Sequence, residues 1–309
     1  MKNLVTIDCE YIMPRFAAAY LVHDGSEAYF VETNTTHAVP RMLEALRKEG
    51  LTPDQVKYVM ITHVHLDHAG GCHALMKACP NATLLAHPRA AKHVIDPSRL
   101  IESAKKVYGE EAYRKLYGEI SPVDATRVRS VADQEEIGGV RFLHTRGHAN
   151  HHVCIFDEEL NGLFTGDSFG LAYPALQRNG LFIFPSTSPT DFDPEEAKKS
   201  VRLICETGAR RLFLTHFGEL TEVEEAAKQL LEQLDFSEKV FENAVQSGFT
   251  EPRLTQVCQE LLMKNFKTAL NTRGLSLSDD EWHWLRLDLE LNAAGIAYSA
   301  MKRRAQARA

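Results

Sequence analysis

The chain has 309 residues, of which 44% are hydrophobic and 25% charged, a composition typical of a globular protein with a large core. The net charge of −7 argues against a nucleic-acid enzyme, which usually carries a basic face. No apolar run reaches the roughly 18 residues of a membrane span, and residues 1–16 lack the basic and apolar regions of a signal peptide. We therefore expect a cytoplasmic protein with no nucleic-acid or membrane partner, whose six cysteines are reduced.

Short apolar runs alternate with helical periodicity over the first part of the chain. Asp24-Gly25 is a hairpin signal between β-prone runs, and a helix follows it with Pro40 in its first turn and Gly50 at its end. Strands are expected at residues 17–22, 28–32, 58–62, 83–86, 140–143, 153–156, 163–165 and 212–215. Residues 97–118 are expected to form a helical insertion. Strands interleaved with helices predict an α/β fold with helix-covered sheets.

The pattern changes to helices alone after about residue 222. Apolar residues between 254 and 266 keep a helical period, and Ser278 with Glu281 forms a capping box. Residues 282–287 alternate, which leaves a strand open there, but the capping box favours a helix. We predict a catalytic domain at 1–222 and a helical C-terminal region at 223–309. That region could serve as a lid over the substrate or as a homodimer interface.

One segment, residues 62–71, carries a dense set of metal-binding side chains. It contains His63, His65, Asp67 and His68, which are costly to bury unless something compensates them. Imidazole and carboxylate together suit zinc, iron or manganese. His63 and His65 lie two residues apart at the end of an extended strand, so their side chains fall on the same side. The sequence therefore predicts a metal site, and a surface histidine cluster is the weaker alternative.

Three further candidates occupy equivalent positions downstream. His148, Asp167 and His216 each follow a short predicted strand. Residues at strand ends converge along one edge of a layered sheet, so separate segments of the chain can meet at one point. We expect these three residues to join the histidine-rich segment.

These motifs, in their order, resemble those of the metallo-β-lactamase superfamily over roughly residues 15–220. The resemblance implies an αββα sandwich of two mixed sheets with two metal ions, most simply zinc, at one edge. By position, His63, His65 and His148 would hold the first ion; Asp67, His68 and His216 would hold the second, with Asp167 bridging them. His152 also matches a family histidine, placed behind the ligands or facing the substrate. His151 has no counterpart, and we expect it to be exposed.

Two short segments depart from the family pattern. The first hairpin ends in Glu32-Thr33-Asn34, where the family often has aspartate, a small residue and glycine. The family's Gly-His-Thr turn is Gly147-His148-Ala149 here. Neither departure removes a ligand, but both could reshape the substrate edge.

The resemblance implies a hydrolase that acts through a metal-bridging hydroxide, with Asp67 and Asp167 as catalytic residues. The expected substrate is a small ester, thioester or lactone, contacted by Tyr173, His152 and Phe184. Three alternatives stay open. They are an iron persulfide dioxygenase with one metal ion, a phosphodiesterase, and a non-catalytic metal-binding protein.

Overall fold

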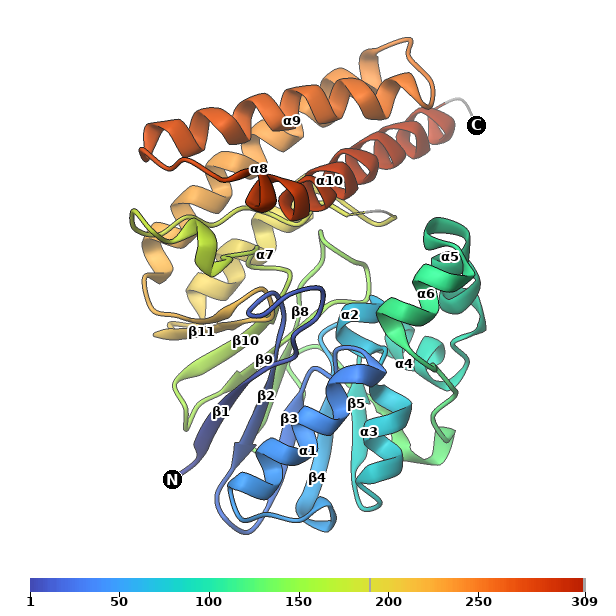
Figure 1. Ribbon diagram of the computed structural model, residues 1–309, viewed down its shortest axis with the longest axis vertical. Coiled ribbons are helices and arrows are strands. Elements are labelled where there is room, and N and C mark those ends of the chain that lie inside the picture. The colour runs from blue at the N-terminus through green and yellow to red at the C-terminus, as the bar shows by residue number, and fades with distance from the viewer. Residues whose placement is uncertain (189, 308–309) are drawn as a thin grey trace. The chain divides into compact units, whose positions relative to one another are not determined.

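The structure, a computed structural model, describes residues 1–188 and 190–307. Its internal contacts divide the chain into two compact units (Figure 1). The sheet unit comprises residues 1–144, 151–166 and 209–221. The helical unit comprises residues 145–150 and 167–208 and the chain from Glu222 onward. Each unit therefore draws on segments that are far apart in the sequence.

The first sheet of the sheet unit has six strands in sequence order. They are β1 (Asn3–Asp8), β2 (Ala18–His23), β3 (Ala28–Val31), β4 (Val56–Met60), β5 (Thr83–Ala86) and β6 (Val128–Ser130). The first three strands pair antiparallel, and β3 to β6 are parallel. The parallel strands β3 and β4 end at the same edge of the sheet. Glu32 follows β3, and the histidine-rich segment follows β4.

The second sheet is also mixed, with its six strands again in sequence order. They are β7 (Glu136–Ile137), β8 (Val140–His144), β9 (Val153–Asp157), β10 (Gly162–Gly166), β11 (Arg211–Leu214) and β12 (Gly218–Leu220). Only β10 and β11 are parallel. Asp167 and His216 follow these two strands, as the sequence predicted.

Buried side chains from both sheets form one core between them. Tyr20, Phe142, Phe164 and Phe213 are fully buried there, with the Phe164 and Phe213 ring centroids 4.8 Å apart. A second core lies between the first sheet and its helices. These helices are α1 (Val39–Lys48), α3 (Cys72–Ala78) and α4 (Pro88–Ile95), and the short α2 (Leu66–Ala69) lies between α1 and α3 in the chain. Two mixed sheets with flanking helices confirm the predicted fold class.

Residues 97–118, which we expected to be helical, form two helices. They are α5 (Ser98–Tyr108) and α6 (Glu110–Tyr117). Gly109 separates them with a φ of +80°, a left-handed conformation that favours glycine and interrupts the helix.

Four helices form most of the helical unit (Figure 1). They are α7 (Pro194–Glu206), α8 (Val223–Gln246), α9 (Arg253–Thr272) and α10 (Asp279–Gln306). The Ser278–Glu281 capping box is present at the start of α10, so the alternating residues 282–287 are helical. No helix in the described part of the chain is long and apolar enough to cross a membrane.

Candidate metal centre

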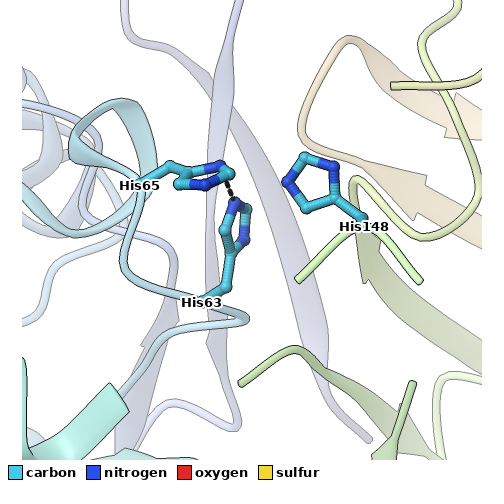
Figure 2. A group of neighbouring side chains, drawn as sticks. All are labelled: His63, His65 and His148. Atoms are coloured by element: carbon cyan, nitrogen blue, oxygen red, sulfur yellow. Dashed lines mark hydrogen bonds between the residues drawn. The ribbon is translucent and has the colours of Figure 1, made fainter. Parts of the chain in front are cut away.

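The histidine-rich segment leaves β4 in extended backbone and enters α2 at Leu66. His63 is fully buried, and its Nε2 lies 2.9 Å from His65 Nδ1 (Figure 2). Two imidazole nitrogens at this distance need a proton or a cation between them, since two lone pairs repel. The local geometry therefore turns a pair of nitrogen donors toward one point.

A second group of donors lies next to this pair in the sheet unit. Ligand atoms of Asp67, His68 and His216 all lie within 4.8 Å of one another. Asp67 Oδ2 is 3.4 Å from His216 Nε2 and 3.8 Å from His68 Nε2. Both histidines are buried, whereas the Asp67 side chain is 26% exposed. Of the seven predicted ligands, the sheet unit thus brings five together.

The remaining two predicted ligands lie close together in the helical unit. His148 Nε2 is 3.5 Å from Asp167 Oδ2, and His148 Nδ1 donates to the Ser186 carbonyl at 3.2 Å. Gly147 allows this turn to pack on α7, because a Cβ at its φ of +117° would lie 2.2 Å from the Ala197 nitrogen. The glycine of the Gly-His-Ala turn is therefore fixed by packing against a helix.

Four of the histidines share one hydrogen-bonding arrangement. His68 Nδ1 meets Glu32 Oε1 at 3.0 Å, His216 Nδ1 meets the Phe16 carbonyl at 2.8 Å, and His148 Nδ1 meets the Ser186 carbonyl. Thr62 Oγ1 donates to the Glu32 carboxylate, so it accepts from His63 Nδ1 at 3.0 Å. These acceptors place the proton on Nδ1 and the lone pair on Nε2, the form in which imidazole binds a metal. The donor set therefore fits a metal ion.

Glu32 accepts hydrogen bonds from His68 and from two threonines next to other ligands. Its side chain is buried, and Oε1 accepts from Thr62, from His68 and from Thr215 Oγ1 at 3.2 Å. Its φ of +66° is uncommon for a residue with a side chain and is found often at functional sites. Glu32 belongs to a segment that departs from the family pattern, and we expected this departure to affect the substrate edge. The structure places it under the ligands instead.

The two residues after Glu32 hold the ligand turn through its backbone. Thr33 Oγ1 donates to the His68 carbonyl at 2.9 Å, and Asn34 Nδ2 donates to the Asp67 carbonyl at 2.8 Å. The whole departing segment 32–34 thus supports Asp67 and His68. Nothing in the sequence pattern indicated this role, nor that of the Phe16 carbonyl, which comes from a distant loop.

His152 and His151 both lie against His63. His152 is buried, with its ring centroid 5.0 Å from that of His63. The expectation that His151 is exposed was wrong. It is half-buried, with ring centroids 6.2 Å from His63 and 6.3 Å from His65, because the chain returns to the site at the start of β9.

Tyr173 and Phe184 lie in an aromatic cluster of the helical unit. Phe184 is buried, and its ring centroid is 5.2 Å from that of Phe266 in α9. Tyr173 is buried as well, 5.0 Å from the Trp284 ring in α10. Their predicted contact with substrate stays a prediction.

Gly166→Ala should weaken metal binding and destabilise the fold. Gly166 has a φ of +49°, and a Cβ there would lie 2.5 Å from both Thr62 Oγ1 and His152 Nε2. The clash would displace the hydroxyl that orients His63. We expect overpacking to lower the free energy of unfolding by about 1–3 kcal/mol, in addition to the cost of the strained backbone. Urea unfolding measures this loss, and a zinc titration measures the affinity.

Gly50→Ala is the matched control for this change. Gly50 has a φ of +75° with nothing within 4 Å of a built Cβ. The variant should lose only about 1–2 kcal/mol of unfolding free energy, from the strained backbone, and keep its zinc affinity. Equal effects of the two variants would show that Gly166 is not constrained by the ligands.

Comparison with known proteins identifies the family. Residues 12–216, more than half of the chain, match the metallo-beta-lactamase superfamily. The chain belongs to this superfamily. Its histidine-rich turn and the strand-end residues that follow β10 and β11 all lie within the matched region, so the predicted resemblance is confirmed.

Relatives and solved structures agree with this assignment. The chain is 31% identical over 188 residues to the metallo-beta-lactamase fold-containing protein ST1585 of Sulfurisphaera tokodaii, covering 58% of this chain and 67% of the relative. The crystal structure of ST1585 from Sulfolobus tokodaii superposes with a TM-score of 0.65 at 21% identity over 96% of this chain and 98% of that one, which shows the fold. An atrochrysone carboxyl ACP thioesterase of Aspergillus terreus is 21% identical, covering 88% of this chain and 71% of the relative.

Proposed function

We propose that this protein is a metal-dependent hydrolase of a small ester, thioester or lactone. One observation carries the proposal. The Nδ1 atoms of His63, His68 and His216 are held by acceptors in the sheet unit, and that of His148 is held in the helical unit. This arrangement prepares four Nε2 atoms as metal donors, which a histidine cluster without a metal does not require. A relative named as a thioesterase supports the choice of an acyl substrate.

The proposed ligand assignment follows the family pattern. We assign His63, His65 and His148 (Figure 2) to one ion. We assign the second ion to Asp67, His68 and His216. Only the family pattern suggests Asp167 as a ligand shared by both ions. Two zinc ions suit this mixed nitrogen and oxygen set, and iron or manganese suits it nearly as well.

A bound pair of cations supplies two kinds of chemistry, a lowered pKa for water and polarisation of the acyl carbonyl. The protein's own residues then hold the reactants. Asp67 is partly exposed and fixed through its backbone by Asn34, so its carboxylate can accept a hydrogen bond from the attacking water and orient it. No serine or cysteine nucleophile is required for this reaction.

Metal content and substrate preference together test the proposal. We expect about two zinc ions per chain in protein purified without chelators, with turnover in a panel of lactones, thioesters, aryl esters and β-lactams. Chelation should abolish that turnover and reloading should restore it. One iron per chain with oxygen uptake on a persulfide would overturn the proposal in favour of a dioxygenase. Faster turnover of an aryl phosphodiester than of any ester would reassign the substrate class.

A further inference from the structure

Helix α10 carries a buried asparagine in an otherwise apolar stretch. Asn292 is 6% exposed and is followed by the buried Ala293 and Ile296. A polar side chain at such a position is costly unless its groups are satisfied. Both ends of the Asn292 amide are bonded, and both bonds reach the same segment of chain more than 100 residues earlier.

That segment is the irregular stretch Pro185-Ser186-Thr187. Asn292 Oδ1 accepts from the Thr187 backbone nitrogen at 2.6 Å, and Asn292 Nδ2 donates to the Pro185 carbonyl at 2.9 Å. A third bond runs from Thr187 Oγ1 to the Asn292 carbonyl at 3.0 Å. The helix therefore clamps the backbone on both sides of Ser186.

The Ser186 carbonyl between these clamped positions accepts the His148 Nδ1 proton at 3.2 Å. The Thr187 N–H lies in the same planar peptide unit as the Ser186 carbonyl, and the Pro185 carbonyl lies in the preceding unit, so the bonds to Asn292 restrict rotation of this plane. The bonds from Asn292 therefore restrict the direction of the carbonyl to which His148 Nδ1 donates. All of these residues belong to the helical unit.

We propose that Asn292 is a positioning residue that acts through the Ser186 carbonyl to orient His148. The C-terminal helix thereby supports a metal ligand, whether it also serves as a lid or as a dimer interface. The role toward a metal rests on the proposed function, because only there is His148 a ligand. The orientation of the ring itself does not depend on that assignment.

The first test uses the metal-free protein. Two-bond proton–nitrogen NMR spectra of histidine-labelled protein report the tautomer of each ring, and the His148 signal is identified by its loss in His148→Gln. We expect His148 to be protonated at Nδ1 in the wild type. In Asn292→Ala its ring should shift toward a mixture of tautomers with faster exchange of the Nδ1 proton.

Ser299→Ala is the matched control on the same helix. Ser299 is also buried and donates to the Phe192 carbonyl at 2.9 Å, so its loss removes one buried bond from α10 to a different loop. Ser299→Ala should leave the His148 signal unchanged. If the two variants lose similar stability and both keep the wild-type His148 signal, Asn292 only packs the helix and the proposal is overturned.

The second test is zinc affinity, measured by competition with a chromophoric chelator. Loss of a group that orients a metal-binding histidine typically weakens affinity by about 10–100-fold, and we expect this for Asn292→Ala but not for Ser299→Ala. Thr187→Val removes only the bond from Thr187 Oγ1 to the Asn292 carbonyl. It should weaken zinc affinity by a smaller factor than Asn292→Ala. It replaces Asn292→Ala if that variant does not fold.

The two proposals fail in different ways. If the wild type binds no metal, the proposed function is overturned and the NMR measurement still decides whether Asn292 orients His148. If the wild type binds zinc and Asn292→Ala keeps both its affinity and the His148 signal, the positioning role is overturned and the proposed function stands.

Discussion

Replacing Asp67 with alanine should lower kcat/KM toward esters by about 10²–10⁴-fold, the range lost with a positioned acid–base group. Asp67 Oδ2 lies 3.4 Å from His216 Nε2 and 3.8 Å from His68 Nε2, among the proposed ligands of one ion. Its side chain is 26% exposed, so the fold should tolerate the change. Steady-state kinetics and metal content should be measured on the same preparation, since the variant also loses an oxygen ligand.

Glu44→Ala provides the control for a lost carboxylate. The Glu44 side chain on α1 is 44% exposed and pairs with Arg47, which holds the pKa of its carboxyl below the usual range. Its removal should leave kcat/KM unchanged. If Asp67→Ala kept full activity at full metal occupancy, the cluster would be a metal-binding site without catalysis.

Replacing Glu32 with glutamine should weaken zinc binding by about 10–100-fold, because the carboxylate that orients His68 loses its negative charge. Glu32 Oε1 accepts from His68 Nδ1, Thr62 Oγ1 and Thr215 Oγ1. A glutamine carbonyl oxygen in the place of Oε1 would accept from these donors without a negative charge, and its NH₂ group would face the Thr62 backbone nitrogen, which donates to Oε2 at 3.4 Å. A buried donor left without an acceptor costs about 1–3 kcal/mol, which we expect in urea unfolding of the metal-free protein.

Asp157→Asn is the matched control for this second prediction. Asp157 is another fully buried carboxylate of the sheet unit, bonded to Lys2 Nζ at 2.6 Å and to the Tyr29 hydroxyl. Burial, and then the Asp157 charge, raise the pKa of Tyr29. Asp157→Asn should therefore destabilise the fold with no change in zinc affinity. A similar loss of zinc affinity in both variants would mean that Glu32 acts only on stability.

The strand and ligand predictions came from local patterns that tertiary structure preserved. Residues 83–86 and 140–143 are short apolar runs that pack well only as buried strands, and the structure has strands there. Residues 97–118 were predicted to be helical, and the structure has two helices there, divided at Gly109 by its left-handed backbone. The ligand candidates were visible because the histidine-rich segment and the later strand-end residues form one pattern, although each strand-end residue by itself would more often be structural.

The supporting residues could not be found in the same way. Glu32, Thr62 and Asn292 are ordinary residues in the sequence, and their roles arise only from which atoms they meet. The Ser186 and Phe16 carbonyls belong to the backbone and carry no sequence signal at all. The partial burial of His151 was missed because it depends on the path of the chain into β9, which no local pattern describes.

By itself, the sequence determined the fold class, the family resemblance and the candidate donor atoms, because these depend on hydrophobic period and on side-chain chemistry at fixed spacing. Only the tertiary structure decided how the donors are oriented, because each Nδ1 bond joins segments that are distant along the chain. Glu32 lies 36 residues from His68 and binds its ring, and Asn292 reaches the loop that holds His148. These long-range hydrogen bonds fix the tautomers, and the tautomers decide whether a group of histidines can hold a metal.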